Sequence, residues 1–269
     1  ARAAGPRAGS DGRLLAAGGR VVRPGRIGLF LDNGRLTVVG TAGRDQVEHF
    51  IVEDAEDPAA TLAAELQARG LTARHVRVGL DRRLAVVKAI ELPRAAGSDI
   101  RAMVGFDLER HVPFPPEGVR FDWVELPGGP DEPHHVLIVA AERRTVERPL
   151  GLLTAAHRRP AAVVVACHEL PALLGREAPT PRAVWAHRNG DATDLLFLDG
   201  RRLLMSRRVT AGTPEDLARE IRRSLAMVRW SDCEAVWLSG SGAEAEIPDL
   251  AALMGVPVSV PPYAADRAA

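Results

Sequence analysis

One order of segments occurs in both halves of the chain: extended apolar segments, then a helix, then a further extended segment. In the first half, alternating apolar residues at 27–31 and 36–39 precede a helix between Asp57 and Gly70. In the second half, a helix that begins after Thr213 again follows extended segments. Strands and helices mixed in this order predict an α/β fold with two lobes.

Both of these helices have residues that suit a helix start. Asp57 can accept hydrogen bonds from the first free N–H groups, and Pro58 fits the first turn. Leu62 and Leu66 then share one face. In the later helix the apolar residues recur at helical spacing, which predicts one buried face: Leu217, Ile221, Leu225 and Val228.

The remaining elements are expected from the same patterns of alternation and punctuation. Expected strands are 75–80, 84–92, 121–126, 136–140, 161–166, 183–187, 195–199, 203–209, 235–239 and 256–260. Further helices are expected after Ser98, at 145–157 and at 248–254. The proline-rich segment 176–182 predicts a boundary between lobes. We expect a flexible tail (1–23), lobe I (24–175) with an inserted subdomain at about 84–141, lobe II (182–262) and a linker (263–269).

The stretch HVPFPPEGVRFDWVEL, residues 111–126, places three prolines and two phenylalanines between a helix and a strand. The preceding helix must end near His111, because proline denies helical geometry to its predecessor and lacks an N–H donor. Phe114 can be a plug for its own subdomain, which we favour, or an exposed anchor. A stiff loop beside a strand edge suits docking, because it loses little entropy on binding.

Composition excludes several classes of function. Charge is balanced, with 35 basic and 35 acidic residues, so no overall field favours nucleic acid. No apolar run approaches the roughly 18–20 residues of a membrane helix.

Cys167 and Cys233 lie far apart among apolar neighbours, which predicts buried thiols in a reducing compartment. His134 and His135 are adjacent and have no third ligand at a usual spacing, so we expect a solvated loop and no metal.

Two stretches resemble known families. In IRAMVGFDLERHVPFPPEGVRFDWVEL, an acidic residue in a helix precedes Pro-Phe and then an aromatic-Asp pair, at Glu109, Pro113, Phe114, Phe121 and Asp122. RRLLMSRRVTAGTPEDLAREIRRSLAMV reads as a Ser-Arg strand and a Glu-Ile-x-x-Ser helix, at Ser206, Arg207, Glu220, Ile221 and Ser224. The order of these elements resembles the PilM family of type IV pilus assembly, and the cytoplasmic domain of the GspL family of type II secretion is similar.

The resemblance covers about residues 26–261. It implies an α/β, actin-like (ASKHA / RNase H-like) two-lobed fold with an inserted small α/β subdomain. It also implies that the residues Glu109, Pro113, Phe114, Phe121 and Asp122 are candidates for partner binding. Which surface binds which partner stays open.

The resemblance raises the question of ATP. Actin-like ATPases hold phosphates with backbone N–H groups from a Gly-containing hairpin in each lobe. In the first hairpin Asp32 and Gly34 keep an Asp-x-Gly core, but Arg35 follows where a small hydroxyl residue is expected. An ordinary two-residue hairpin is the favoured reading. In the second hairpin, residues 187–189 lack both the aspartate and the glycine.

A third loop, SGSG at 239–242, keeps the outline of an adenosine-side loop through Gly240 and Gly242. Both phosphate-binding hairpins thus lack expected residues, and only the SGSG loop keeps its outline. We therefore expect that catalysis is lost and that no metal or cofactor is needed. Asp32, Gly34, Gly240 and Gly242 then remain as vestigial nucleotide-binding candidates. An ATP-binding actin-like ATPase is the alternative.

The resemblance implies a non-enzymatic scaffold on the cytoplasmic side of the bacterial inner membrane, in a type II secretion or type IV pilus assembly platform. The expected partners are the N-terminal region of the assembly ATPase and the cytoplasmic tail of a PilN- or GspM-like membrane protein. A homodimer is a further expectation, and nucleic acid is not expected to bind. A membrane helix C-terminal to residue 269 would favour the GspL-like layout.

Overall fold

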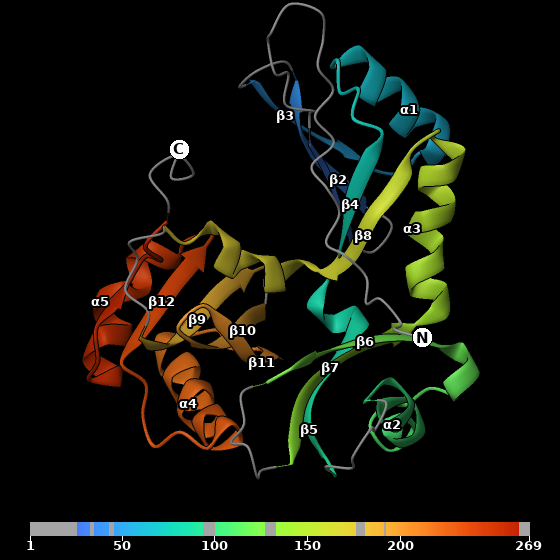
Figure 1. The fold of residues 1–269 in the computed structure, drawn as a ribbon. Coiled ribbons are helices and arrows are strands. Elements are labelled where there is room, and N and C mark those ends of the chain that lie inside the picture. Colours follow the sequence, from blue (N-terminus) through green and yellow to red (C-terminus); the bar gives the residue numbers. More distant parts are fainter. Residues whose placement is uncertain are drawn as a thin grey trace, which may run out of the picture.

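The computed structural model describes residues 26–32, 35–42, 46–93, 100–126, 133–175, 181–190 and 192–263. These residues form two lobes and a smaller unit, each built on its own sheet (Figure 1). The strand orders are β3-β2-β1-β4-β8 in lobe I, β11-β10-β9-β12-β13 in lobe II and β5-β7-β6 in the inserted subdomain. The expected two-lobed α/β fold with an inserted small subdomain is therefore confirmed.

Lobe I is a five-stranded sheet with helices on one face. Its strands are β1 (Ile27–Asp32), β2 (Arg35–Ala42), β3 (Gln46–Val52), β4 (His75–Leu80) and β8 (Arg159–Val165), and its helices are α1 (Pro58–Ala68) and α3 (Arg143–Ala155). Leu62 and Leu66 of α1 and Leu153 of α3 are buried in one cluster with the inward side chains of the strands. Both helices lie beside the sheet in Figure 1.

The start and end of α1 follow the sequence closely. The Asp57 carboxylate accepts hydrogen bonds from the N–H groups of Ala59 and Ala60, at 3.0 Å each, which satisfies donors that a helix start leaves free. Gly70 follows the helix with a φ of 65°, a left-handed conformation that glycine adopts without strain.

The strand β3 was not expected from the sequence. Its inward residues Phe50 and Val52 join the core of lobe I, while Val47 and Ile51 point outward. The polar residues Glu48 and His49 interrupt the apolar pattern, so the alternation is visible only once the partner strand is known. Antiparallel pairing with β2, in which Val39 lies opposite His49, places this strand at the edge of the sheet.

The inserted subdomain consists of β5 (Ala85–Leu92), β6 (Val119–Glu125), β7 (His134–Glu142), α2 (Ile100–Asp107) and three-residue 3-10 helices at Leu108–Arg110 and Pro116–Gly118. The helix ends before His111, as the prolines predict. The strands β4 and β5 are consecutive in the sequence but belong to different sheets. The link between them, Asp81–Arg83, therefore carries the chain out of lobe I.

One expectation in this subdomain is corrected. His134 and His135 do not lie in a loop but open β7, opposite Leu92 and Glu91 of β5. The strand extends further back than its apolar core, because main-chain pairing with β5 holds these two polar residues in register. Their imidazoles lie near the carboxylates of Glu125 and Glu91.

Lobe II contains β9 (Arg182–Asn189), β10 (Ala192–Asp199), β11 (Arg202–Val209), β12 (Ala235–Gly240), β13 (Val258–Ser259), α4 (Pro214–Leu225) and α5 (Ala243–Met254). The expected start of the last helix at Pro248 is wrong, since α5 begins five residues earlier and contains this proline. The expected strand 256–260 is reduced to two residues by the flanking prolines 257 and 261, which cannot donate to a ladder.

The two lobes share an apolar contact. Trp185 of β9 and Trp237 of β12 meet edge to face, with ring centroids 5.9 Å apart, and Tyr263 also contacts Trp185. These rings pack with Val165 of lobe I, at the carboxyl end of β8. This packing brings the ends of the lobe I strands close to the sheet of lobe II, where the polar cluster described next is found.

Candidate functional site

The β1–β2 hairpin of lobe I reaches the space between the lobes. Asp32 lies opposite Arg35 in the register, so the connection has two residues, as expected for an ordinary hairpin. The predicted residue Gly34 lies outside the described residues. The Asp32 carboxylate forms an ion pair with Arg83, which stands in the link between lobe I and the subdomain. The acidic residue that resembles a metal-proximal aspartate is thus paired with a cation of its own chain.

Asp81, in the same link, is a buried acid between the lobes, with 2% of its surface exposed. Its Oδ1 atom accepts a hydrogen bond from the N–H group of Arg83 at 2.8 Å. It also accepts one from the Arg208 guanidinium, on strand β11 of lobe II, at 2.8 Å. A buried carboxylate needs such partners, because an unpaired charge in the interior is costly.

Arg82 makes a second set of bonds across the lobes. Its Nε atom donates to the Ser206 hydroxyl at 2.8 Å, and Nη2 donates to the Ser206 carbonyl at 2.7 Å. Its Nη1 atom donates to the Ala85 carbonyl at 2.7 Å. Burial lowers the pKa of this guanidinium, although nearby Cys167, Asp194 and Asp81 oppose the shift.

His168 completes the environment of Ser206. Its Nε2 atom lies 2.7 Å from the Ser206 hydroxyl. Burial, with a smaller contribution from Arg82, lowers the pKa of His168 to about 4, so the ring is neutral near pH 7. Arg82 can only donate to this hydroxyl, so the Ser206 oxygen accepts from Arg82 and its own proton is available for the contact with His168. Ser206 is 2% exposed, so this Ser–His pair is part of the interior rather than a nucleophile open to substrate.

Asp194 of β10 is the second buried acid, also 2% exposed. It lies 3.8 Å from Arg208, and the same guanidinium serves Asp81. Burial raises the pKa of Asp194 despite this neighbour, and the charge of Asp81 adds to the rise. We call the following residues the interlobe cluster: Asp32, Asp81, Arg82, Arg83, His168, Asp194, Ser206 and Arg208.

The chemistry of the interlobe cluster follows from its charges. Each of its three carboxylates has a guanidinium within 4 Å. Arginine stays protonated in proteins and donates in a fixed planar geometry, so it remains a counter-ion at any ordinary pH. The described residues contain no group of three or more side chains placed to hold a metal ion. The arrangement can hold two lobes together, and each of its carboxylates faces a guanidinium of the same chain.

The glycines of lobe II have mainly a packing role. Gly240 has a φ of 100°, and a Cβ atom there would lie 2.2 Å from the Arg188 carbonyl oxygen of β9. Close approach of β12 to β9 therefore requires this glycine. Gly242 has a φ of 74°, with open space around it, and directly precedes α5. Arg188 then ties β9 to this helix by an ion pair with Glu246.

The Ser-Arg strand is β11 and the Glu-Ile-x-x-Ser helix is α4, and bonds between their side chains hold the two together. Arg207 donates to the Ser224 hydroxyl at 2.9 Å and lies 3.2 Å from the Glu220 carboxylate. Ser224 donates to the Glu220 carbonyl at 2.7 Å, and Ile221 is fully buried. These residues therefore position the strand that carries Ser206.

The five partner-binding candidates divide into two groups. Phe114 and Phe121 pack against the core of the subdomain, so the plug interpretation of Phe114 is confirmed. Glu109, Pro113 and Asp122 are exposed on the surface. The structure thus places all five on one subdomain without bringing them into a single pocket.

The edge strand β6 lies between the helix α2 and lobe I. Arg101 of α2 stacks over the Trp123 ring, with 4.7 Å from its guanidinium carbon to the ring centre, and it lies 5.8 Å from that of Phe121. On the other face, Arg120 forms an ion pair with Glu147 of α3, at 2.9 Å. The strand is therefore held on both faces, while within the described residues only β7 pairs with its backbone.

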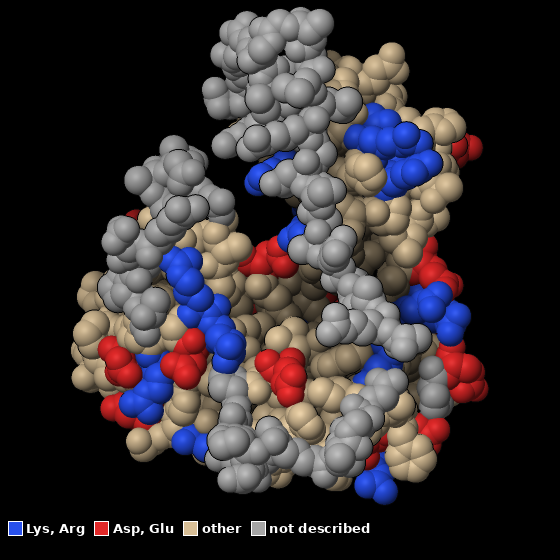
Figure 2. Space-filling view, viewed as in Figure 1, with Lys and Arg blue, Asp and Glu red and all other residues tan. Residues whose placement is uncertain are grey.

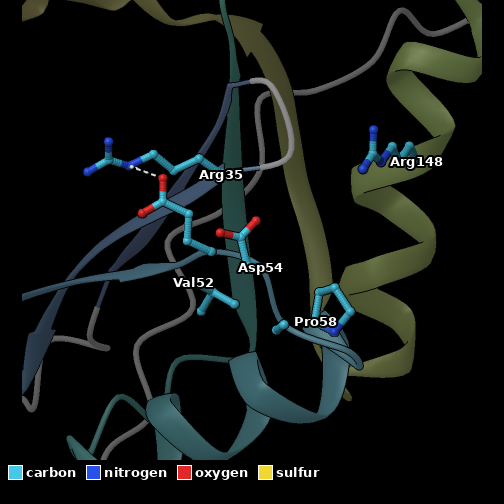
Figure 3. Close-up of a pocket in the computed structure, with 7 residues that line it drawn as sticks. Arg35, Val52, Asp54, Pro58 and Arg148 are labelled. Carbon is cyan, nitrogen blue, oxygen red and sulfur yellow. Dashed lines mark ion pairs between the residues drawn. The ribbon is translucent and has the colours of Figure 1, made fainter.

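A small pocket lies at the end of lobe I, where β2 and β3 meet the start of α1 (Figure 3). Its volume is about 260 Å³, and its lining is mostly polar: Arg35, Val52, Glu53, Asp54, Ala55, Pro58 and Arg148. Arg35 forms an ion pair with Glu53 at 3.6 Å, drawn as a dashed line, and Arg148 faces from α3. The pocket is below the usual range of roughly 300–1,000 Å³ for small-molecule sites.

Neither cysteine is placed for chemistry. Both are buried and free, as predicted. Burial raises the pKa of Cys167 to about 12, so its thiolate, the reactive form, is scarce. Its sequence neighbours face elsewhere: His168 contacts Ser206, and Glu169 pairs with Arg77.

The surface carries both signs of charge. In Figure 2, lysine and arginine are interspersed with aspartate and glutamate over all parts of the face shown. None of the helices in the described part of the chain is long and apolar enough to span a bilayer. No family model matches the sequence, and no curated protein matches it.

Two α/β lobes, with a small α/β unit inserted in the first, are an arrangement consistent with the actin-like fold. Among solved structures, the chain is similar to the PilM–PilN type IV pilus biogenesis complex, with a TM-score of 0.67 and 21% identity, covering 87% of each chain. It is also similar to the cytoplasmic domain of EpsL, an inner membrane component of the type II secretion system of Vibrio cholerae. There the TM-score is 0.59 and the identity 15%, over 80% of this chain and 82% of that chain.

A third similar structure is a protein of unknown function with an actin-like ATPase fold from Bacteroides thetaiotaomicron. The TM-score is 0.53 at 11% identity, over 90% of this chain and 92% of that one. At these identities the likeness establishes the fold. The actin-like fold is therefore confirmed, and the resemblance to the PilM and GspL families is confirmed at the level of the fold.

Proposed function

We propose that this protein is a non-enzymatic scaffold on the cytoplasmic side of a bacterial inner membrane, within a type II secretion or type IV pilus assembly platform. The observation that carries the proposal is the interlobe cluster. Its carboxylates are paired with Arg83 and Arg208 from the same chain. Triphosphate and Mg²⁺ would have to compete with these internal ion pairs. The fold of PilM and of the EpsL cytoplasmic domain supports the assignment to such platforms.

A protein that works by holding neighbours benefits from a fixed shape. The cross-lobe bonds of Arg82 and Arg208 restrict the angle between the lobes. Binding to a rigid surface costs less ordering entropy than binding to a mobile one. We infer that the scaffold presents its docking surfaces without needing ATP to close the cleft.

The docking surface that we propose for a partner segment is the open edge of β6. An extended peptide can add to an open sheet edge through main-chain hydrogen bonds, and neighbouring side chains then supply specificity. Asp122 is exposed on this strand, and Glu109 and Pro113 lie exposed on the turn that leads to it. The carboxylates of Glu109 and Asp122 suit a basic peptide. The likeness to the PilM–PilN complex supports a membrane partner of the PilN kind.

The test is calorimetric titration of the protein with two ligands: the cytoplasmic tail of the membrane partner and the N-terminal region of the assembly ATPase. We expect binding to at least one of them. The double variant Glu109→Arg with Asp122→Arg should weaken binding at the β6 edge by at least tenfold. A matched control, Asp216→Arg on the exposed face of α4, should leave it unchanged. Failure of both ligands to bind would contradict the proposal.

The rival function is an ATP-binding actin-like ATPase. It predicts micromolar affinity for ATP and Mg²⁺ that is abolished by Asp32→Ala. We expect no such affinity, because the Asp32 carboxylate is paired with Arg83. Titration with ATP and Mg²⁺ separates the two functions in a single experiment.

A further inference from the structure

Each of the three sheets has two edge strands, and most of these edges are protected. Open edges expose unpaired backbone groups, so natural proteins protect them with short strands, proline, charge or covering elements. In lobe II, the edge strand β13 has only two residues. The other edge strand, β11, packs against β5, an edge strand of the subdomain, so these two strands cover each other. In lobe I, β8 begins with Arg159 and Pro160. The strand β6, the open edge proposed above for a partner segment, carries the charged residues Arg120, Asp122 and Glu125, whereas charge of this kind is largely missing from β3.

The strand β3 has none of these protections. It extends over seven residues, Gln46–Val52, and contains no proline, lysine or arginine. Its one carboxylate, Glu48, lies on the helix-covered face, 3.7 Å from Arg69, the residue that caps the end of α1. Within the described part of the chain, β3 pairs only with β2. A strand of this length with a free backbone edge is suited to main-chain pairing.

The outward face beside this edge is apolar. Val47 is 65% exposed and Ile51 is 38% exposed, whereas Phe50 and Val52, on the other face, are buried. Val39 of β2, which lies opposite His49, is 44% exposed and extends the same stripe. β-Branched side chains in contact across two strands stabilise a sheet.

The stripe is self-complementary. Val47 and Ile51 stand two residues before and two residues after His49. If two copies of β3 pair antiparallel about a two-fold axis at His49, each Val47 lies opposite Ile51 of the other copy. Both cross-strand pairs are then apolar, and no like charges from these outward positions meet at the seam. A two-fold interface requires this kind of self-matching.

We propose that β3 is a homodimerisation edge, where a second copy of this chain pairs antiparallel about His49. The two five-stranded sheets of lobe I then form one sheet that crosses the dimer. This site is separate from the β6 edge proposed above for a partner and does not depend on that function. A strand pair alone is a small interface, so we expect a weak dimer. Attachment of both copies to one assembly would raise its population by effective concentration.

The test is sedimentation equilibrium of the full chain at up to about 0.5 mM, with three variants. Val47→Glu and Ile51→Lys should each weaken the dimer by at least tenfold, because each places a charge against an apolar partner. The double variant should restore dimerisation, because the introduced carboxylate of one copy then faces the introduced ammonium of the other. Val124→Glu, at an exposed valine on the β6 edge, is the matched control and should have no effect. Circular dichroism checks that each variant is folded.

The restoration is specific to the proposed register, because a shift by one residue would turn these side chains to opposite faces. Single variants that dimerise like the parent, or a double variant that stays monomeric, would overturn the proposal. A parent chain that is monomeric over the whole range would also overturn it.

Discussion

The interlobe cluster and the outer edges of the sheets differ in where their polar groups are satisfied. In the cluster, Asp81 is 2% exposed, and its bonds are made inside the chain. At the edges, the backbones of β3 and β6 pair on one side only within the described residues. In an actin-like fold the space between the lobes is the expected functional site. Here the described residues in that space bond to one another, and the binding surfaces that we propose lie at the edges.

The largest effect is expected from Arg208→Met, which tests the interior part of this comparison by removing an arginine from the interlobe cluster. The variant leaves Asp194 without its guanidinium partner, and Asp81 keeps only the more distant guanidinium of Arg83, at 3.6 Å. Removing one member of a buried ion pair typically costs about 3–5 kcal/mol. We expect a loss of about 3 kcal/mol in the free energy of unfolding, measured with urea.

The control for this variant is Arg219→Met, which removes an exposed pair with Asp216 on α4. Such surface pairs contribute about 0–1 kcal/mol, so its stability should hardly change. Equal losses in the two variants would mean that the interlobe cluster contributes nothing beyond a surface pair. The comparison between interior and edge would then fail.

The next effect is a dependence on pH that comes from His168. Its pKa is about 4 in the folded protein, against 6.5 for an unperturbed histidine. The unfolded chain therefore binds a proton between these values and the folded chain does not. The stability is fully present above pH 6.5 and is lost as the pH falls toward 4, by up to about 3 kcal/mol. His168→Gln should remove this part of the slope in urea unfolding measured at several pH values.

A smaller effect is expected at a helix end, outside both regions. Asp57→Ala removes the acceptor for the N–H groups of Ala59 and Ala60. A lost N-cap costs about 1 kcal/mol. The expected change is a lower urea midpoint with an unchanged m-value. Asp57→Asn, which keeps the acceptor, should retain most of the stability.

The smallest effect on stability is expected at the surface of the subdomain. Phe106 of α2 is 87% exposed, so Phe106→Ser removes little packing. The change in unfolding free energy should stay within about 0.5 kcal/mol. A loss above 2 kcal/mol, measured with urea, would show that this part of the subdomain surface is covered in solution. The comparison between interior and edge would then be weaker.

Much of the fold could be predicted from the sequence, because its signals are local. Capping by Asp57, the prolines after His111 and the spacing of Leu217 and Ile221 depend only on nearby residues, and each marks its element correctly. The strand β3 was missed since Glu48 and His49 disguise its alternation. The helix α5 was expected too late, because Pro248 looked like a first-turn proline but lies inside the helix.

The interlobe cluster could not be predicted, because its members meet only through the tertiary fold. Asp81, Arg82 and Arg83 looked like a turn between two strands, and nothing local distinguished Arg208 from other arginines. Ser206 was noted as part of a family-like stretch, although its cross-lobe bonds were not foreseen. Of the candidates for nucleotide binding, Asp32 alone lies in this cluster. A useful signal would have been the acid and two arginines at 81–83, which directly follow the strand 75–80 with its regular apolar alternation.

The hydrogen bond between Arg208 and Asp81 joins residues 127 positions apart. A ribosome adds about 5–20 residues per second, so roughly 6–25 s separate the synthesis of the two residues. During that interval the apolar core of lobe I can form, while Asp81 still lacks its counter-ion. The newborn first lobe must therefore keep this carboxylate in water, and the lobes can close only after β11 has left the ribosome.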